Sequence, residues 1–343
     1  MRADTRGRLA KAALLAGALQ GCAHLRPEDF ARGTVEVACC GHADQPVELH
    51  FLGVAGWLIR KGSTAVLTAP LFSNPGFLRT GLQQIDPDPD RIERHLPDVE
   101  DVTAILVGHG HYDHLMDVPY IVDRRAPQAV VFGNRTVGHQ LAPFGLRGGA
   151  VYEVREEETA DLEHPGRWIP AGPGVRVLPL RSDHAPHFAG IVLYGGDRHT
   201  DMSEVPASAN EWLEGETVAW LIDLLNADGT VALRIYFQDA VAAAPYGLVP
   251  PPEVLGDSVR VDVALIVPAT YAEVDWHPEA LLESANPRHV LLCHWEDFFQ
   301  PPSLPAEPVP FTRLPEFVER LRRALPEGTG WHLPLPGTRF LFR

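Results

Sequence analysis

Short β-forming segments predict an antiparallel meander at the start of the folded region. The segments cover residues 47–52, 57–60 and 64–68, and turn-forming glycines stand between them. Runs of this length bounded by turn residues are typical of strands joined by hairpins. After residue 68 the pattern changes to alternating strands and helices.

An apolar run at residues 102–107, ended by Gly108, predicts a strand that is buried on both faces. The same reasoning places the other elements to within about two to four residues. Strands are expected near residue 151 and at 175–180, 191–193, 219–224, 231–237, 263–267, 289–293 and 338–342, and helices at 119–123, 135–141, 278–285 and 314–325.

The order of these elements predicts one layered α/β domain over residues 46–343. A strand-rich beginning followed by βα units in each half favours helices packed outside two central sheets. The chain has 343 residues, of which 45% are apolar, so it can bury a large core. Many of its prolines lie in predicted loops such as 250–252 and 301–310, which indicates rigid connections and not disorder.

Residues 1–21 have the pattern of an export signal. Basic residues precede an apolar stretch at 12–19, which is shorter than the roughly 20 residues that span a bilayer. The stretch ends in Leu19-Gln20-Gly21-Cys22, which resembles the lipobox of bacterial lipoproteins. This resemblance implies a lipid on Cys22, residues 22–45 as a tether, and attachment to the outer membrane facing the periplasm, where Ala23 fits the sorting. An ordinary cleaved signal or a frayed helix is the alternative.

The charge of the chain limits its partners. The formal net charge is −16, and it falls to −19 without residues 1–21, which carry four basic groups and one acid. Nucleic acid is therefore excluded as a substrate class, because phosphate contacts need lysine and arginine. An acidic surface does not hold an anionic membrane, so a lipid on Cys22 would have to anchor the protein. No feature of the sequence points to a protein partner.

The cysteines are Cys22, Cys39, Cys40 and Cys293, and none of them forms a CxxC pair. A zinc ribbon or a thioredoxin-like site is therefore not indicated. If the chain is exported, Cys39 and Cys40 can be oxidised to each other or to a partner, and two partly buried thiols are the alternative. Cys293 is expected to point into the core as a small hydrophobe.

The segment His109-Gly110-His111-Tyr112-Asp113-His114 follows the buried strand and is dense in metal ligands. Histidine nitrogen and carboxylate oxygen suit a divalent ion such as zinc. His109 and His111 can point to one side of an extended turn, while Asp113 and His114 reach a neighbouring position. The segment therefore predicts a site for two metals.

More ligand types stand at the ends of other predicted strands. His184, Asp239 and His294 each follow such a strand, and strand ends converge on one edge of a layered α/β fold. His187 is the alternative to His184, which we favour because it comes sooner after its strand. Beside the last ligand, Trp295, Phe298 and Phe299 either wall an apolar pocket or pack in the core. His199 is expected on the surface, and His277 at the start of a helix.

The order and spacing of these ligand candidates resemble the metallo-β-lactamase superfamily, whose signature is HxHxDH followed by a His, an Asp and a last His. The resemblance covers nearly all of residues 45–343 and implies an αββα sandwich. It implies that His109, His111 and His184 bind a first metal, that Asp113, His114 and His294 bind a second, and that Asp239 bridges them.

Within the superfamily the chain is similar to the branch that includes N-acylphosphatidylethanolamine-hydrolysing phospholipase D and ascorbate-lactonase-like proteins. The similar stretches are Phe51-Leu52-Gly53, Leu71-Phe72-Ser73-Asn74-Pro75, His111-Tyr112-Asp113-His114 and His294-Trp295. One departure is Ala69, where this branch usually has an Asp. Because a carboxylate that orients a ligand changes metal affinity by about 10- to 100-fold, the departure puts full occupancy of one site in question.

Two metals imply hydrolysis without a serine nucleophile. Ions about 3.5 to 4 Å apart share a water, lower its pKa toward 7 and present hydroxide to an ester-like bond. Zn²⁺ is the expected ion, with Mn²⁺ and Fe²⁺ as alternatives, and Asp113 or Asp239 would take up a proton. A lipid-derived phosphodiester is favoured over other small-molecule substrates such as a lactone or an amide. A redox protein similar to flavodiiron enzymes and a non-catalytic metal-binding lipoprotein are the competing classes.

Overall fold

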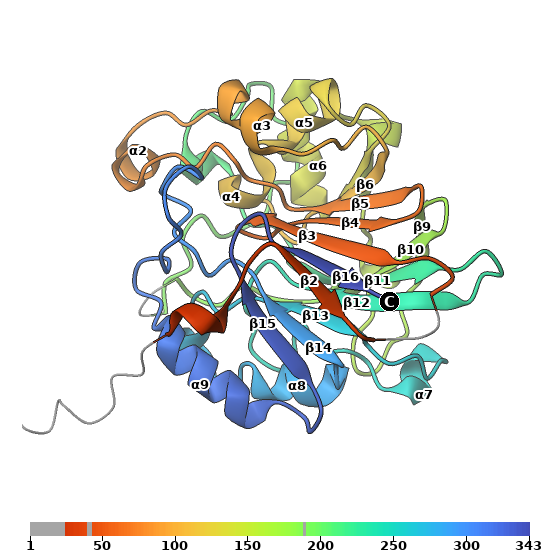
Figure 1. The fold of residues 1–343 in the computed structure, drawn as a ribbon. Coiled ribbons are helices and arrows are strands. Elements are labelled where there is room, and N and C mark those ends of the chain that lie inside the picture. The colour runs from red at the N-terminus through yellow and green to blue at the C-terminus, as the bar shows by residue number, and fades with distance from the viewer. Residues whose placement is uncertain (1–24, 40–42, 188–189) are drawn as a thin grey trace, which may run out of the picture.

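Two sheets face each other between two layers of helices (Figure 1) in the computed structural model, which describes residues 25–39, 43–187 and 190–343. Across the first sheet the strands are β1 (Phe30–Ala31), β15 (Gly330–Pro334), β14 (His289–Leu292), β13 (Val263–Ile266), β12 (Val231–Phe237), β11 (Val218–Leu225), β10 (Val175–Arg181) and β9 (Ile169–Gly172). Across the second they are β2 (Thr34–Val37), β16 (Arg339–Phe342), β3 (Val47–Gly53), β4 (Gly56–Lys61), β5 (Thr64–Thr68), β6 (Val102–Leu106), β7 (Val130–Gly133) and β8 (Val151–Glu153).

The helices lie outside the two sheets. They are α2 (Phe77–Leu82), α3 (Pro89–His95), α4 (Tyr112–Leu115), α5 (Val118–Arg124), α6 (Arg135–Leu141), α7 (Pro252–Leu255), α8 (Glu279–Ala285) and α9 (Leu314–Ala324). Short 3-10 turns are η2 (Pro27–Asp29), η3 (Ala142–Phe144), η4 (Gly148–Ala150), η5 (Glu156–Glu158), η6 (Ala209–Glu211) and η7 (Tyr271–Glu273). In Figure 1, α3, α5 and α6 cover the second sheet from above, and α8 and α9 cover the first from below. The predicted αββα sandwich is confirmed.

Three apolar clusters explain why the layers hold together. One lies between the sheets and contains Trp57 and Trp220, both fully buried. The others lie between each sheet and its own helices. On α9 the buried residues Leu314, Phe317, Val318 and Leu321 repeat at helical spacing, so a single stripe faces the first sheet.

The sequence placed most elements correctly. The predicted meander is antiparallel β3, β4 and β5, and the predicted buried strand is β6, which pairs in parallel on both sides. Residues 191–193, predicted as a strand, instead lie in the loop between β10 and β11. There the Ile191 carbonyl accepts a hydrogen bond from the His187 amide at 2.8 Å, so the segment closes a loop and extends no sheet.

The prediction that residues 22–45 form a tether is wrong for part of that segment. β1 pairs with β15 and β2 with β16, both in parallel. These strands are two and four residues long and pair on one side only, with partners near the end of the chain. Local sequence gives little signal for such edges.

The predictions for the signal peptide, Cys22 and Cys40 concern residues outside the described part of the chain, and the boundaries at residues 21 and 45 stay predictions. Cys39 is disulfide-bonded. Within the described ranges, no helix is both long and apolar enough to cross a membrane.

A buried ion pair in the first sheet gives a test of the fold. Arg234 on β12 is fully buried, and its guanidinium donates to Asp223 at 2.7 and 2.8 Å and to Asp257 at 2.8 and 3.0 Å. We expect Asp223→Ala to lower the free energy of unfolding by about 3 to 5 kcal/mol, because it leaves the buried guanidinium of Arg234 with Asp257 as its remaining carboxylate partner. Urea denaturation measures this loss.

The control for this prediction is Asp86→Ala, which removes an exposed ion pair with Arg79. Its expected cost is below about 1 kcal/mol. Equal losses in the two variants would contradict the structural role of the buried pair.

Candidate metal centre

The predicted metal loop begins where β6 ends and turns directly into α4. His111 occupies the N-cap of α4, so Tyr112, Asp113 and His114 lie on its single turn and are all buried. The turn is closed by the amides of His114 and Leu115, which donate to the His111 carbonyl at 3.1 and 3.0 Å. This tight turn is what brings the ligand types at both ends of the loop to one place.

Close packing requires two glycines of this loop, and the sequence did not reveal this role. A Cβ on Gly108 would lie 2.1 Å from Asp239 Oδ1, and one on Gly110 would lie 2.4 Å from the Leu213 carbonyl. The side chain of Gln140 donates to the Gly110 carbonyl at 2.9 Å and fixes that part of the loop. The glycines were visible in the sequence, but their neighbours come from distant segments.

The first group of ligand types is His109, His111 and His184, whose ligand atoms lie within 4.8 Å of one another. The His184 Nδ1 lies 2.6 Å from the Ala185 carbonyl, and that contact requires a proton on Nδ1. Its Nε2 is therefore free to accept. Nε2 of His109 and of His111 is buried without a hydrogen-bond partner. Three neighbouring imidazoles whose Nε2 atoms make no hydrogen bond within the described part of the protein suit a divalent cation.

The second group is Asp113, His114 and His294, again within 4.8 Å. The Nε2 of His294 lies 3.2 Å from both Asp113 Oδ2 and His114 Nε2. His294 follows β14 and has a positive φ of 51°, a strained conformation of the kind that clusters at functional sites. Three buried side chains of metal-binding type thus converge here, an arrangement that suits a divalent cation.

Asp239, which follows β12, lies between the two groups. Its Oδ2 accepts a hydrogen bond from the Gly108 amide at 2.6 Å, and its Oδ1 lies 2.9 Å from His109 Nδ1. The same carboxylate is 3.8 Å from His114 Nδ1. Asp239 therefore orients His109 so that Nε2 faces the first group. The bridging role expected for it stays a prediction.

The electrostatics of the first group and of Asp113 favour the protonation states that metal binding needs. Burial, helped by neighbouring histidines, lowers the pKa of His109, His111 and His184 well below its usual range, so these rings are neutral. Burial alone would raise the pKa of Asp113, but His114 and His294 hold it well below its usual range. A neutral imidazole and an ionised carboxylate are the binding forms of these side chains.

His187, the alternative to His184, lies outside both ligand groups. Its ring stacks on that of His184 with centroids 4.7 Å apart. Its Nδ1 accepts a hydrogen bond from the Leu193 amide at 3.1 Å, so a neutral ring carries its proton on Nε2. His187 also lines the cleft described below. The Nε2 of His187 is thus a hydrogen-bond donor beside the first group of ligand types.

The other candidates divide between core, surface and cleft. Cys293 is fully buried and free, as predicted, and His199 is exposed. His277 precedes α8, and its Nε2 lies 3.0 Å from the Val267 carbonyl. Trp295 is a core residue whose indole donates to the Pro334 carbonyl, so it walls no pocket.

Ala69 is fully buried among the apolar side chains between the sheets and has a φ of 23°. No carboxylate stands at this position, as the sequence indicated. The orienting contact on His109 comes instead from Asp239, across from the other sheet. His109 therefore keeps a carboxylate that orients its ring, although position 69 has no Asp.

An apolar cleft of about 300 Å³ opens above both ligand groups. Phe298 and Phe299 line it, as one reading of the sequence expected. Much of the remaining wall was missed because it comes from irregular segments. That wall includes Phe77, Leu193, Val267, Ala269, Thr270, Tyr271, Glu273, Val309, Phe311 and Arg313.

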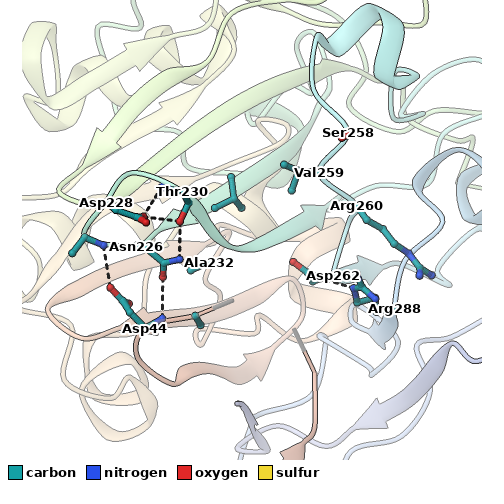
Figure 2. Close-up of a pocket in the computed structure, with 13 residues that line it drawn as sticks. Asp44, Asn226, Asp228, Thr230, Ala232, Ser258, Val259, Arg260, Asp262 and Arg288 are labelled. Atoms are coloured by element: carbon teal, nitrogen blue, oxygen red, sulfur yellow. Dashed lines mark hydrogen bonds and ion pairs between the residues drawn. The ribbon is translucent and has the colours of Figure 1, made fainter. Parts of the chain in front are cut away.

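A hollow of about 820 Å³ lies away from the ligand groups. It is lined by polar side chains of the β11–β12 turn, such as Asp228 and Thr230, and by Arg260 and Arg288 (Figure 2). Arg260 donates to the carbonyls of Asn286 and Pro287, and Arg288 donates to Asp262. These contacts serve the protein itself. No chemistry converges there as it does at the metal loop.

Comparison with known proteins gives a family. A model of the family described as a beta-lactamase superfamily domain matches residues 64–243, more than half of the chain. A metal-dependent hydrolase of Cupriavidus taiwanensis is 25% identical over 217 residues, which cover 62% of this chain and 65% of that protein. The match thus spans slightly less than two thirds of the relative's own length.

Solved structures share the fold. Igni18, a metallo hydrolase from Ignicoccus hospitalis, superposes with a TM-score of 0.52 at 15% identity, covering 87% of this chain and 99% of that one. CmlA, a diiron beta-hydroxylase from Streptomyces venezuelae, superposes with a TM-score of 0.50 at 15% identity, covering 88% of this chain and 54% of that one. At these identities the likeness is one of architecture.

Proposed function

This chain belongs to the beta-lactamase superfamily, and from that premise we propose that it is a metal-dependent hydrolase acting on an ester-like bond. The observation that carries the proposal is the pair of ligand groups at the floor of one cleft. Each group gathers three buried or half-buried metal-binding side chains, two from the segment His109 to His114 and one from a distant part of the chain. A solvated polar loop would not bury unpaired imidazole nitrogens in this way.

The residues present fit two divalent cations, held by His109, His111 and His184 and by Asp113, His114 and His294. When bound, such ions supply an activated water and positive charge near the reacting oxygen. The protein's own part is orientation. Asp239 and the Ala185 carbonyl fix the rings of His109 and His184, and Asp113 and Asp239, which both line the cleft, are placed to accept a proton.

Within this class we favour a lipid-derived phosphodiester as substrate. The wall of the cleft is largely apolar, and Phe77, Phe298 and Phe311 contribute to it, as suits a substrate with a long apolar group. Arg313 also lines the cleft and gives it a cation for an anionic group. The proposed lipid on Cys22, with export to the outer membrane, would place the enzyme beside such substrates.

A substrate screen tests the proposal. The purified protein, reconstituted with zinc, is assayed on phosphodiesters, lactones, amides and β-lactams, and its metal content is measured in parallel. We expect close to two metals per chain and hydrolysis of phosphodiesters. Activity confined to lactones or amides would replace the phosphodiester by the alternative substrate class.

The same experiment separates the non-hydrolytic alternatives. Bound iron with oxygen-consuming activity would assign a redox function. Fewer than about one metal per chain after zinc reconstitution would favour a non-catalytic protein.

A further inference from the structure

Four exposed large apolar side chains lie on α2 and in the loop before α9, at or next to the mouth of the cleft. Trp276, which is 69% exposed, lies apart from them before α8. Phe311 is 93% exposed, Leu82 82% and Leu78 72%, and Phe77 is 57% exposed. Phe77 and Phe311 line the cleft itself. We call these four residues the apolar rim. Scattered exposed apolar residues are ordinary on a monomer, but a group beside a ligand cleft marks an interaction surface.

Helix α2 presents its apolar side outward. At about 100° per residue, Phe77, Leu78 and Leu82 fall on one arc of roughly 140°, and all three are exposed. The buried residue of α2 is Thr80, whose hydroxyl donates to the Pro75 carbonyl. A surface helix normally buries its apolar stripe and exposes its polar one. In α2 this order is reversed, so most of its apolar arc faces solvent in the described part of the chain.

The rim is continuous with the wall of the cleft. The ring of Phe77 meets that of Phe299 edge to face, with centroids 5.0 Å apart, and Phe299 stacks beside Phe298 at 4.5 Å. Phe298 in turn contacts the ring of His294, at 5.0 Å. A chain of aromatic rings thus leads from exposed α2 to the second ligand group. An apolar group entering past the rim would therefore have aromatic rings to contact along its way.

The course of the chain favours a lipid surface as the occupant. Phe30, near the beginning of the described residues, packs on Trp295 at 5.5 Å, and Trp295 is the neighbour of His294. Cys22, the predicted site of the lipid, precedes Phe30 by eight residues, which span at most about 29 Å. In Figure 1 the described chain begins on the side where α2 lies. A lipid on Cys22 would therefore hold this side of the protein near a membrane.

The charges near the rim also suit a lipid surface. Arg79 lies on α2, and Arg313 lies two residues after Phe311, and both side chains are about half exposed or more. Each pairs with an exposed acid, Asp86 or Glu316, in contacts that contribute little in water. Arginines next to apolar side chains are typical of surfaces that lie at the headgroup boundary of a membrane.

We propose that the apolar rim docks on a phospholipid surface, so that the substrate enters the cleft from the lipid and not from water. This inference rests on the proposed function for the identity of the substrate. It goes beyond a lipid anchor, because an anchor alone would keep this side near the membrane without bringing the cleft into contact with it. Docking through the rim fixes the cleft against the surface.

A reporter tryptophan tests the contact. The full chain carrying Leu82→Trp is mixed with phosphatidylcholine vesicles whose acyl chains are brominated, which quench tryptophan only on contact. We expect most of the added fluorescence to be lost. The matched control is Leu162→Trp at an exposed position remote in sequence from the rim and the cleft, which should be no more quenched than the unaltered chain.

A second substitution tests whether the rim supplies the affinity. Adding Leu78→Ser to the Leu82→Trp chain should lower its vesicle partition by about tenfold, because a leucine side chain no longer leaves water. Adding Val259→Ser, which alters an exposed apolar residue outside the rim, should leave it unchanged. Thermal melting and zinc content of each variant establish that the fold is intact.

Three results would overturn the proposal. One is unquenched Leu82→Trp in a chain that sediments with the vesicles, which would mean anchoring without docking. Another is equal quenching of Leu82→Trp and Leu162→Trp. The third is a dimer in sedimentation velocity that Leu82→Ser abolishes, which would assign the rim to a second copy. Quenching needs no turnover, so it remains readable if the hydrolase proposal fails, and a soluble phosphodiester remains cleavable if docking fails.

Discussion

The variant His111→Ala is expected to lower turnover by more than about a hundredfold and to reduce the zinc bound per chain. His111 caps α4, is 3% exposed, and its Nε2 is buried without a partner next to His109 and His184. Residues that merely support a metal ligand change metal affinity by about 10- to 100-fold, so loss of a ligand itself should exceed that range. Initial rates on the substrate found by the screen, with metal analysis of the same samples, measure both effects.

The matched control is His199→Ala. His199 is exposed and takes no part in either ligand group, so its removal should leave both rate and zinc content unchanged. Thermal melting without metal separates loss of function from loss of fold in each variant. A His111→Ala protein that keeps its zinc and its rate would refute the first ligand group.

Much of the fold followed from local patterns, and the exceptions have a common cause. β6 and α9 were predictable because a run or a stripe of apolar residues reflects burial directly. β1 and β2 were missed because they are short edge strands whose pairing depends on β15 and β16, some 300 residues away. Hydrogen bonds between distant segments leave no periodic trace in either of them.

The candidate site likewise contains residues that local patterns predicted and contacts that they did not. The cluster at His109 to His114 was visible because four ligand types stand within six residues, and His184 and His294 because they end strands. The contact of Asp239 with His109 could not be predicted from the sequence, because it depends on how the two sheets pack against each other. The cleft walls at residues 269–273 and 309–313 could not be predicted either, because the sequences of irregular loops have no hydrophobic periodicity. The reversed polarity of α2 becomes meaningful only once the surrounding surface is known.

The second large effect is expected for Asp239→Asn, which keeps the size of the side chain. Asp239 receives two donors, the Gly108 amide at one oxygen and His109 Nδ1 at the other. An asparagine has one oxygen and one NH₂ group, so one of these donors would face another donor. The favourable response is for His109 to move its proton to Nε2, which would block the atom that faces the first group. The variant also loses a buried negative charge beside His114.

We therefore expect Asp239→Asn to weaken zinc binding by about 10- to 100-fold, and turnover to fall with it. In the metal-free variant, long-range proton–nitrogen correlation spectra should show the His109 proton on Nε2, whereas the unaltered protein should carry it on Nδ1. The control is Asp197→Asn, an exposed acid outside both ligand groups, which should change neither property. Unchanged zinc affinity together with an unchanged His109 tautomer would mean that Asp239 neither orients that ring nor bridges two ions. The contact of Asp239 with His109, which joins the two sheets, would then have no part in positioning the metal ligands.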